Sequence, residues 1–162
     1  MKPSGRFLAK VTGKSYGNIL LRRQQYRICD DKERSLNISK NIISAKLLNS
    51  SAVIHRAMRD HELRIDVEKF KKVFENLKKS SVSAYNGMDS DSLRGLEGEC
   101  ASSYFSVFDD MILQQKEDFF FKSRSRRPPM DNVNALLSFS YSLLTSICAS
   151  ALESVGLDPY AG

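Results

Sequence analysis

The 162-residue sequence predicts a mainly α fold with a remnant of β-structure, a strand or hairpin, near its N-terminus. Apolar residues recur every three or four positions through most of the chain, as they do on the buried face of an α-helix. Asn or Asp precedes several of these segments, where its side chain can cap a helix N-terminus. The one strand-like run covers residues 6–12 and lies between Gly5 and Gly13.

Three helices are predicted in the first half of the chain. The first is expected to follow Asn18, a candidate cap. Apolar residues between positions 32 and 60 recur at spacings of seven and four, which fits one long helix or two helices that break near Ser50. A third helix, with its lysines facing solvent, is indicated by apolar residues spaced by three, four and three, namely Val67, Phe70, Phe74 and Leu77.

The second half of the chain mixes helices with loops. The expected order is a loop over 80–87, a helix over 93–108, a helical segment over 111–121, a loop over 122–129 and a last helix. Pro128 and Pro129 stop any helix within the second loop. Asp131 can cap the last helix, and Gly156 can end it.

Several classes of protein are excluded by composition. No apolar run approaches 18 residues, so we expect neither a transmembrane helix nor a membrane partner. The N-terminal residues lack the apolar segment of a signal peptide. The charged fraction of 27%, with nine Phe and six Tyr, argues against intrinsic disorder. Cys29, Cys100 and Cys148 lie far apart without CxxC spacing, which predicts buried thiols of a cytosolic protein.

The net charge of +6 is distributed unevenly. Residues 1–29 carry seven Lys and Arg and no acid, whereas 81–121 carry eight acidic and two basic side chains. Four more cations follow within residues 122–127. Two basic blocks around an acidic stretch indicate a surface for a polyanion such as nucleic acid, beside a cluster of carboxylates. A solvated face that aids solubility explains the charge equally well.

Glu97 is the first candidate for chemistry, because it lies within a helix that contains two glycines, Gly95 and Gly98. A glycine inside a helix costs about 1 kcal/mol relative to alanine, so some contact should require it. With Ala101 and Ser102 the glycines form a thin surface where a backbone or a nucleic-acid strand could approach. Tight helix packing, with Glu97 in solvent, is the alternative.

Two further features contain groups that could bind phosphate or line a polar site. Four cations on a proline-stiffened loop could bind phosphates, or the loop could be a solvated linker. These cations are Lys122, Arg124, Arg126 and Arg127. A polar stripe on the last helix could face a buried polar site, or could form ordinary bonds between helices. This stripe consists of Asn134, Ser138, Tyr141 and Thr145.

Segments along nearly the whole chain resemble, in family order, the CRISPR-associated spacer-acquisition integrase, the metal-dependent endonuclease of CRISPR adaptation, in its type I-C form. The resemblance rests on the motifs SGRFLA at 4–9, GNILLRR at 17–23 with QYR at 25–27, LRGLEG at 93–98, YF at 104–105, RSRRPP at 124–129, NVNALL at 132–137 and GLDPY at 156–160.

This resemblance implies an N-terminal β-domain that dimerises, followed by a helical catalytic domain. Residues 1–16 then correspond to a remnant of the β-domain and a linker. Residues 17–162 correspond to the catalytic domain, truncated at its C-terminus. The family holds Mg²⁺ or Mn²⁺ on a Glu, a His and an Asp. Glu97 matches the Glu, while the His and Asp follow the segment that matches 156–162. We therefore expect this chain to be a fragment that is inactive alone.

The family joins the 3′-hydroxyls of protospacer DNA to the CRISPR repeat by phosphodiester transesterification. Its implied partners are double-stranded DNA, a small dimeric second adaptation protein and a second copy of itself, in the prokaryotic cytoplasm. By this resemblance Glu97 is the metal ligand and catalytic residue. The hypothesised phosphate contacts are Arg22, Arg23, Lys122, Arg124, Arg126 and Arg127, and the hypothesised lining residues are Tyr104, Asn134 and Tyr141. The competing hypothesis is a non-enzymatic, basic helical protein that binds nucleic acid or serves as a scaffold.

Overall fold

A computed structural model describes residues 19–161, which form five α-helices. They are α1 (Ile19–Asp30), α2 (Lys32–His61), α3 (Val67–Tyr85), α4 (Ser90–Phe105) and α5 (Asn132–Ser154). Two short 3₁₀ turns lie at Glu62–Arg64 and Asp109–Met111. The predicted mainly α class is confirmed. The predicted strand over 6–12, the domain boundary after residue 16 and the cap at Asn18 lie outside the described residues.

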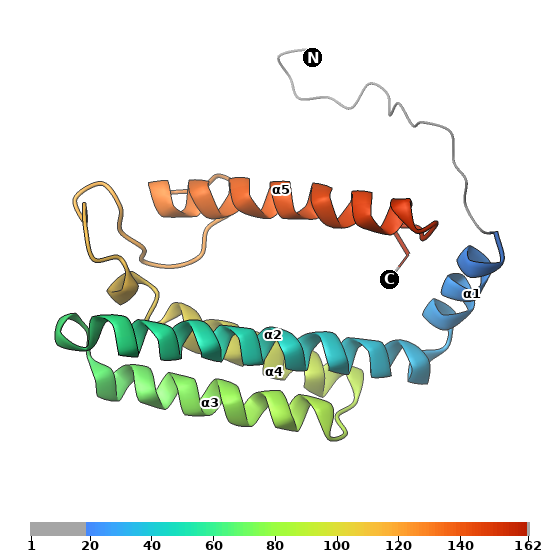
Figure 1. Cartoon of the computed structure of the whole chain (residues 1–162), viewed down its shortest axis with the longest axis horizontal. Helices are drawn as coiled ribbons and strands as arrows, with labels where there is room; N and C mark the ends of the chain where they lie inside the picture. Colours follow the sequence, from blue (N-terminus) through green and yellow to red (C-terminus); the bar gives the residue numbers. More distant parts are fainter. Residues whose placement is uncertain (1–18, 162) are drawn as a thin grey trace, which may run out of the picture.

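The helices α2, α3 and α4 form a bundle, and α5 runs alongside it in the opposite direction to α2 (Figure 1). At one end, α1 lies beside the segment that follows α5. A long loop between α4 and α5 passes around the other end of the bundle. The first and last described segments therefore meet at one end of the molecule.

The core of the bundle consists of the apolar residues whose spacing predicted the helices. Ile54 of α2 and Phe70 and Leu77 of α3 are completely buried. The α4 residues Leu93 and Cys100 pack into the same cluster. Burying a side chain of this size stabilises the fold by about 1.5–3 kcal/mol. The core thereby fixes α4, and Glu97 with it, against α2.

The region from 32 to 60 forms one helix and does not break near Ser50. Ser51 is buried there, and its hydroxyl donates to the carbonyl of Leu48 at 2.7 Å. Because the hydroxyl is satisfied within the helix, a small serine can sit in the core without ending the helix.

The predicted loop over 80–87 is wrong for most of its length, because α3 continues to Tyr85. Ser80, Ser81 and Ala84 are buried, so small residues rather than large apolar ones line the last turns. The hydroxyl of Ser44 in α2 donates to the carbonyl of Ser81 at 2.8 Å. The helix ends just before Gly87, whose φ of +117° is a conformation that glycine adopts readily.

The predicted helix over 111–121 is also wrong, and α4 ends at Phe105 rather than near Phe108. Asp109 organises the loop instead: its carboxylate accepts from the backbone N–H of Phe121 at 2.7 Å and from Nζ of Lys116 at 2.8 Å. The Phe121 ring is buried and lies 5.0 Å from the ring of Phe108. These contacts replace helical hydrogen bonds. The predicted loop over 122–129 is confirmed.

Asp131 caps α5 as expected, since its carboxylate accepts from the backbone N–H of Asn134 at 2.7 Å. Gly156, with φ of +84°, follows the end of α5. Within residues 19–161, α5 is the one helix long and apolar enough to cross a membrane by length and composition. The sequence prediction of no transmembrane helix was based on uninterrupted apolar runs of about 18 residues. Serines interrupt the apolar residues of α5, so α5 did not meet that criterion.

The three cysteines differ in burial, and none forms a disulfide. Cys100 is buried in the bundle core, as predicted. Cys29 is half-buried and Cys148 is exposed on α5, so the prediction of three buried thiols is wrong for these two. Cys148 ends a run of α5, residues 139–148, in which every side chain is exposed.

The burial of Ala84 gives a direct test of the longer α3. We expect Ala84→Leu to lower the free energy of unfolding by about 1–3 kcal/mol, because three extra carbons must enter a filled space. Val82→Leu, at a 58% exposed position of the same helix turn, should change it by less than about 0.5 kcal/mol. Urea unfolding followed by circular dichroism measures both. Equal effects of the two variants would contradict burial of this segment.

Asp109 gives the fold a pH dependence. Burial raises the pKa of its carboxyl, but hydrogen bonds from Lys116 and Phe121 outweigh burial, so the pKa lies below its ordinary value. A lowered native pKa stabilises the fold above pH ~4 and this stabilisation is lost as pH falls through the native pKa. Asp109→Asn should therefore flatten the dependence of thermal stability on pH below about 4. If thermal stability falls with pH below about 4 in Asp109→Asn as steeply as in wild type, this account is contradicted.

Candidate functional site

A cleft of about 720 Å³ lies between α2, α4, α5 and the loop before α5. It brings together four residues that the sequence nominated from distant positions: Glu97, Tyr104, Arg126 and Tyr141. Lys46 of α2 and Arg94 of α4 also line it. The predicted carboxylate thus lies in a cleft with cations from three different elements.

Glu97 is held at the wall of this cleft by an ion pair across two helices. Nζ of Lys46 lies 2.5 Å from Oε1 of Glu97, and both side chains remain partly exposed. A Cβ added at Gly95 or Gly98 would meet no atom within 4 Å. The surface beside these glycines is therefore open among the described residues, rather than covered by another helix.

Sequence reasoning missed Lys46 and Arg94. Arg94 is adjacent to the glycine motif, one turn before Glu97, and could have been included for that reason. Lys46 carried a weaker signal, since it is the one charged side chain between Lys40 and Arg56. A lone cation in a long uncharged stretch draws attention to the residue but does not identify its partner.

Arg124 does not point freely to solvent, because α5 holds its guanidinium. Nη1 donates to Oδ1 of Asn134 at 2.8 Å, and Nη2 lies 3.4 Å from the hydroxyl of Ser138. The guanidinium carbon lies 5.6 Å from the centre of the Tyr141 ring. The polar stripe of α5 therefore faces the basic loop and fixes its first arginine.

Asn134 is completely buried and ties the loop to α5. Its Oδ1 accepts a second bond from the backbone N–H of Ser125 at 3.0 Å. Its Nδ2 donates to the carbonyl of Ser123 at 2.9 Å and to the carboxylate of Asp131 at 2.7 Å. A buried amide with every polar atom paired gives this segment one defined position. Asn134 thus positions the loop and does not itself line the cleft.

Arg126 and Arg127 differ from Arg124 in that their guanidinium groups form no hydrogen bond with any residue in 19–161 and are exposed. Together with Arg124 they line a second hollow of about 660 Å³ on the same side of α5. Its other walls are Ser138, Tyr141, Ser142 and Thr145. Arg126 belongs to both hollows, so the basic surface is continuous with the cleft that contains Glu97. Lys122 is exposed and lies outside both linings.

Arg22 and Arg23 of α1 are not brought to the cleft. Nε of Arg22 donates to the carbonyl of Gly156 at 3.3 Å, and Arg23 is exposed. Gln25 of α1 accepts from the backbone N–H of Asp158 at 2.8 Å. The hydroxyl of Tyr26 donates to the Asp158 carboxylate at 2.6 Å, and this bond raises the pKa of Tyr26. The polar side of α1 holds the segment after α5.

Tyr104 and Tyr141 lie on facing helices in the same cleft. Burial raises the pKa of the Tyr104 hydroxyl above its usual value, and the nearby Tyr141 adds to the effect. Tyr104 is therefore a neutral hydrogen-bond donor and acceptor at ordinary pH. The two rings form apolar and aromatic walls beside the charged groups.

The oxygen atoms in the cleft lining are of the kind that a hard divalent cation binds. They include too few acidic side chains to form a metal site. Mg²⁺ and Mn²⁺ take oxygen ligands, and Glu97, Asn49 and Ser50 offer side-chain oxygens in the lining. No group of three or more His, Cys, Asp or Glu side chains within residues 19–161 could hold a metal ion. The cleft lining therefore contains one acidic side chain, Glu97, and not a complete metal site.

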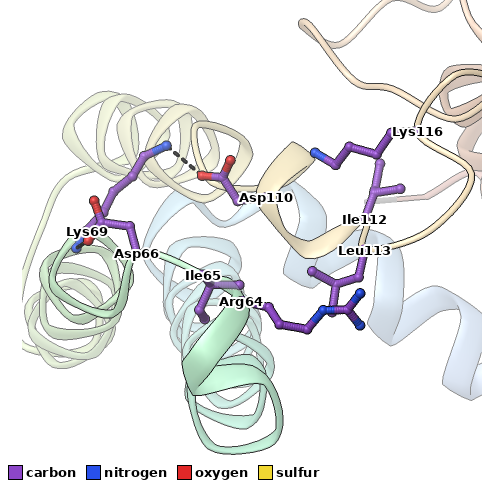
Figure 2. Close-up of a pocket in the computed structure, with 8 residues that line it drawn as sticks. All are labelled: Arg64, Ile65, Asp66, Lys69, Asp110, Ile112, Leu113 and Lys116. Atoms are coloured by element: carbon purple, nitrogen blue, oxygen red, sulfur yellow. Dashed lines mark hydrogen bonds and ion pairs between the residues drawn. The ribbon is translucent and has the colours of Figure 1, made fainter.

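A third hollow, of about 470 Å³, lies at the turn between α2 and α3, where Asp110 extends toward α3 (Figure 2). Nζ of Lys69 pairs with the Asp110 carboxylate at 2.7 Å (Figure 2). Lys116, in the same lining, is paired with Asp109. Because two of its three cations already have acidic partners, this hollow attracts anions less than the arginine-lined surface does.

The geometry defines a helical domain that presents one carboxylate between basic walls, an arrangement that suits a partner with closely spaced phosphates. The family model described as "CRISPR associated protein Cas1" matches residues 1–162. The chain is 45% identical over 158 residues to "CRISPR-associated endonuclease Cas1 1" of Chlorobaculum tepidum, and 47% identical over 165 residues to "CRISPR-associated endonuclease Cas1 2" of Rhodospirillum rubrum. This chain belongs to the Cas1 family.

Each match covers 98% of this chain and 46% of the relative, so the chain spans about half the length of these relatives. A solved structure titled "Partial Cas6-RT-Cas1--Cas2 complex" superposes with a TM-score of 0.74 at 29% identity. The superposition covers 98% of this chain and 46% of the matched chain in that complex. The helical arrangement is therefore shared with a Cas1-containing assembly. The type I-C form stays a prediction.

Proposed function

We propose that this chain forms the helical part of a metal-dependent DNA endonuclease and integrase of CRISPR spacer acquisition. The observation that carries this proposal is the position of Glu97 in a cleft with Lys46, Arg94 and Arg126. Membership of a family whose relatives are named endonucleases supports it. The basic walls would hold DNA phosphates while the carboxylate takes part in the chemistry.

The proposed reaction joins a 3′-hydroxyl of protospacer DNA to a phosphodiester of the CRISPR repeat. The hydroxyl oxygen forms a new bond to phosphorus and gives its proton to the medium, and the bond from phosphorus to the leaving 3′-oxygen breaks as that oxygen takes up a proton from the medium. When bound, Mg²⁺ or Mn²⁺ polarises the phosphoryl oxygen and stabilises the leaving oxygen. Attack by water in place of the hydroxyl gives cleavage.

Each side chain of the site has a defined task in this proposal. Glu97 supplies one metal ligand, and the remaining ligands come from outside residues 19–161. Arg126 and Arg127, together with Arg124 which Asn134 positions, contact phosphates through their guanidinium groups. Lys122, Arg22 and Arg23 lie outside the cleft, so they are assigned to DNA segments beyond it. Tyr104 and Tyr141 line the cleft.

The proposed partners follow from the family and from the solved assembly. That assembly's title names both Cas1 and Cas2, and we infer that this protein works with a small dimeric Cas2 partner. Double-stranded protospacer and repeat DNA are the proposed substrates, because a phosphate polymer matches the basic walls. We also propose a homodimer through the N-terminal β-domain and a location in the prokaryotic cytoplasm.

The matched pair Glu97→Gln and Glu99→Gln tests this function. Glu99 is on the same helix but is exposed and outside the cleft. Each variant is made in a chimera that takes its remaining half from the Chlorobaculum tepidum relative. Glu97→Gln should lower Mn²⁺-dependent DNA cleavage and joining by about a hundredfold or more, because loss of a direct ligand exceeds the 10- to 100-fold cost of losing an outer partner. Glu99→Gln should retain activity.

Equal activity of wild type and Glu97→Gln would refute the assignment. DNA binding without any Glu97-dependent metal effect would instead favour the competing hypothesis, a non-enzymatic basic protein that binds nucleic acid or serves as a scaffold. Circular dichroism spectra of both variants check that the helices are retained.

A further inference from the structure

The cleft that contains Glu97 holds a carboxylate on a surface otherwise suited to phosphates. Glu97 is the one acidic side chain of the lining, and the cations there are Lys46, Arg94 and Arg126. No group of three or more His, Cys, Asp or Glu within residues 19–161 could hold a metal ion, so these residues do not fit a bound divalent cation. A carboxylate that nothing neutralises would repel the phosphates that the basic walls attract.

Lys46 is the cation that neutralises this carboxylate. Its Nζ reaches from the middle of α2 to Oε1 of Glu97 on α4, 51 residues away, at a distance of 2.5 Å. Arg94, on the same helix as Glu97, forms its ion pair with Asp91 at 3.7 Å instead. The guanidinium of Arg126 is exposed at the loop side of the cleft. The Lys46–Glu97 pair therefore leaves the lining with two further cations and no unpaired acid.

We propose that Lys46 neutralises Glu97 so that this cleft binds the phosphates of duplex DNA without a divalent cation. The proposal rests on the proposed function only in that DNA enters this cleft. Lys46 is a positioning residue, because it acts through Glu97 and its ammonium is occupied by the carboxylate. Arg126, whose guanidinium forms no hydrogen bond within residues 19–161, contacts the phosphate itself.

Two other roles of Lys46 lead to different DNA-binding behaviour. An ordinary surface ion pair contributes little even to stability, and its removal would leave DNA affinity unchanged. A lysine that contacts phosphate directly would, when removed, lower the slope of log affinity against log salt by about 0.9, and removal of Glu97 could not restore that contact. A neutralising lysine differs from both, because removing the two charges together restores affinity and slope.

The experiment measures binding of a fluorescent DNA duplex to this chain by anisotropy, with EDTA present, over a range of salt concentrations. Lys46→Met, which keeps the length and removes the charge, should weaken binding about fivefold at low salt, the size expected for one exposed charge pair. The double variant Lys46→Met/Glu97→Gln should bind with the affinity and salt slope of wild type. Lys79→Met removes the same charge from an exposed position on α3 outside the cleft lining, and as the control it should match wild type. Lys46→Gln provides a second uncharged variant should Lys46→Met fail to fold.

Wild-type affinity in both Lys46→Met and Lys46→Gln would overturn the proposal. A double variant that binds as weakly as Lys46→Met, or whose slope is lower by about 0.9, would also overturn it, because Lys46 would then contact phosphate directly. An equal loss in Lys79→Met would do the same, since only the overall charge would matter. If wild type binds DNA with Mg²⁺ but not in EDTA, this proposal fails and the proposed function stands. If it binds under neither condition, the proposed DNA-binding role of the cleft fails as well.

Discussion

The buried amide of Asn134 is the constraint on which the basic side of the site depends. It is completely buried, and its oxygen and nitrogen together join Arg124, the backbone at 123 and 125 and the cap residue Asp131. An unpaired amide in such a place costs about 1–3 kcal/mol, so the loop cannot move away without losing several bonds at once. A loop of four cations, which repel one another, thereby acquires a fixed position beside α5. Arg126 reaches the cleft from that fixed base.

The carboxylate side of the site depends on a different kind of constraint, the packing of α4 into the bundle core. Leu93 and Cys100 are buried one turn before and one turn after Glu97, and Cys100 also lines the cleft, so Glu97 lies at the edge of the core. Apolar packing of α4 thus fixes the position of Glu97, and the buried hydrogen bonds of Asn134 fix the position of the arginine loop. The two halves meet across the cleft through Tyr104 on α4 and Tyr141 on α5.

Periodic apolar spacing predicted the helices from which the core is built, because residues such as Phe70 and Leu77 are both large and buried. The same signal failed over 80–85, where Ser81 and Ala84 fill the core without being recognisably apolar. It failed again over 111–121, where Asp109 holds a loop through contacts between residues 12 apart. The position of Glu97 in the cleft was predictable through the family motif, because the glycines alone left open tight helix packing with Glu97 in solvent. Its partner Lys46 was not, because helix spacing gives no information on contacts between residues 51 apart.

The central claim is that the arginine loop beside the Glu97 cleft contacts the DNA backbone. The most direct test is the salt dependence of duplex DNA binding by this chain, wild type against Arg126→Ala/Arg127→Ala. Each lost phosphate contact lowers the slope of log affinity against log salt by about 0.9, so the double variant should lose about 2 from the slope. Lys78→Ala/Lys79→Ala, which removes two exposed cations from α3, should leave the slope almost unchanged. An unchanged slope in the arginine variant, or an equal fall in the lysine variant, would contradict the claim.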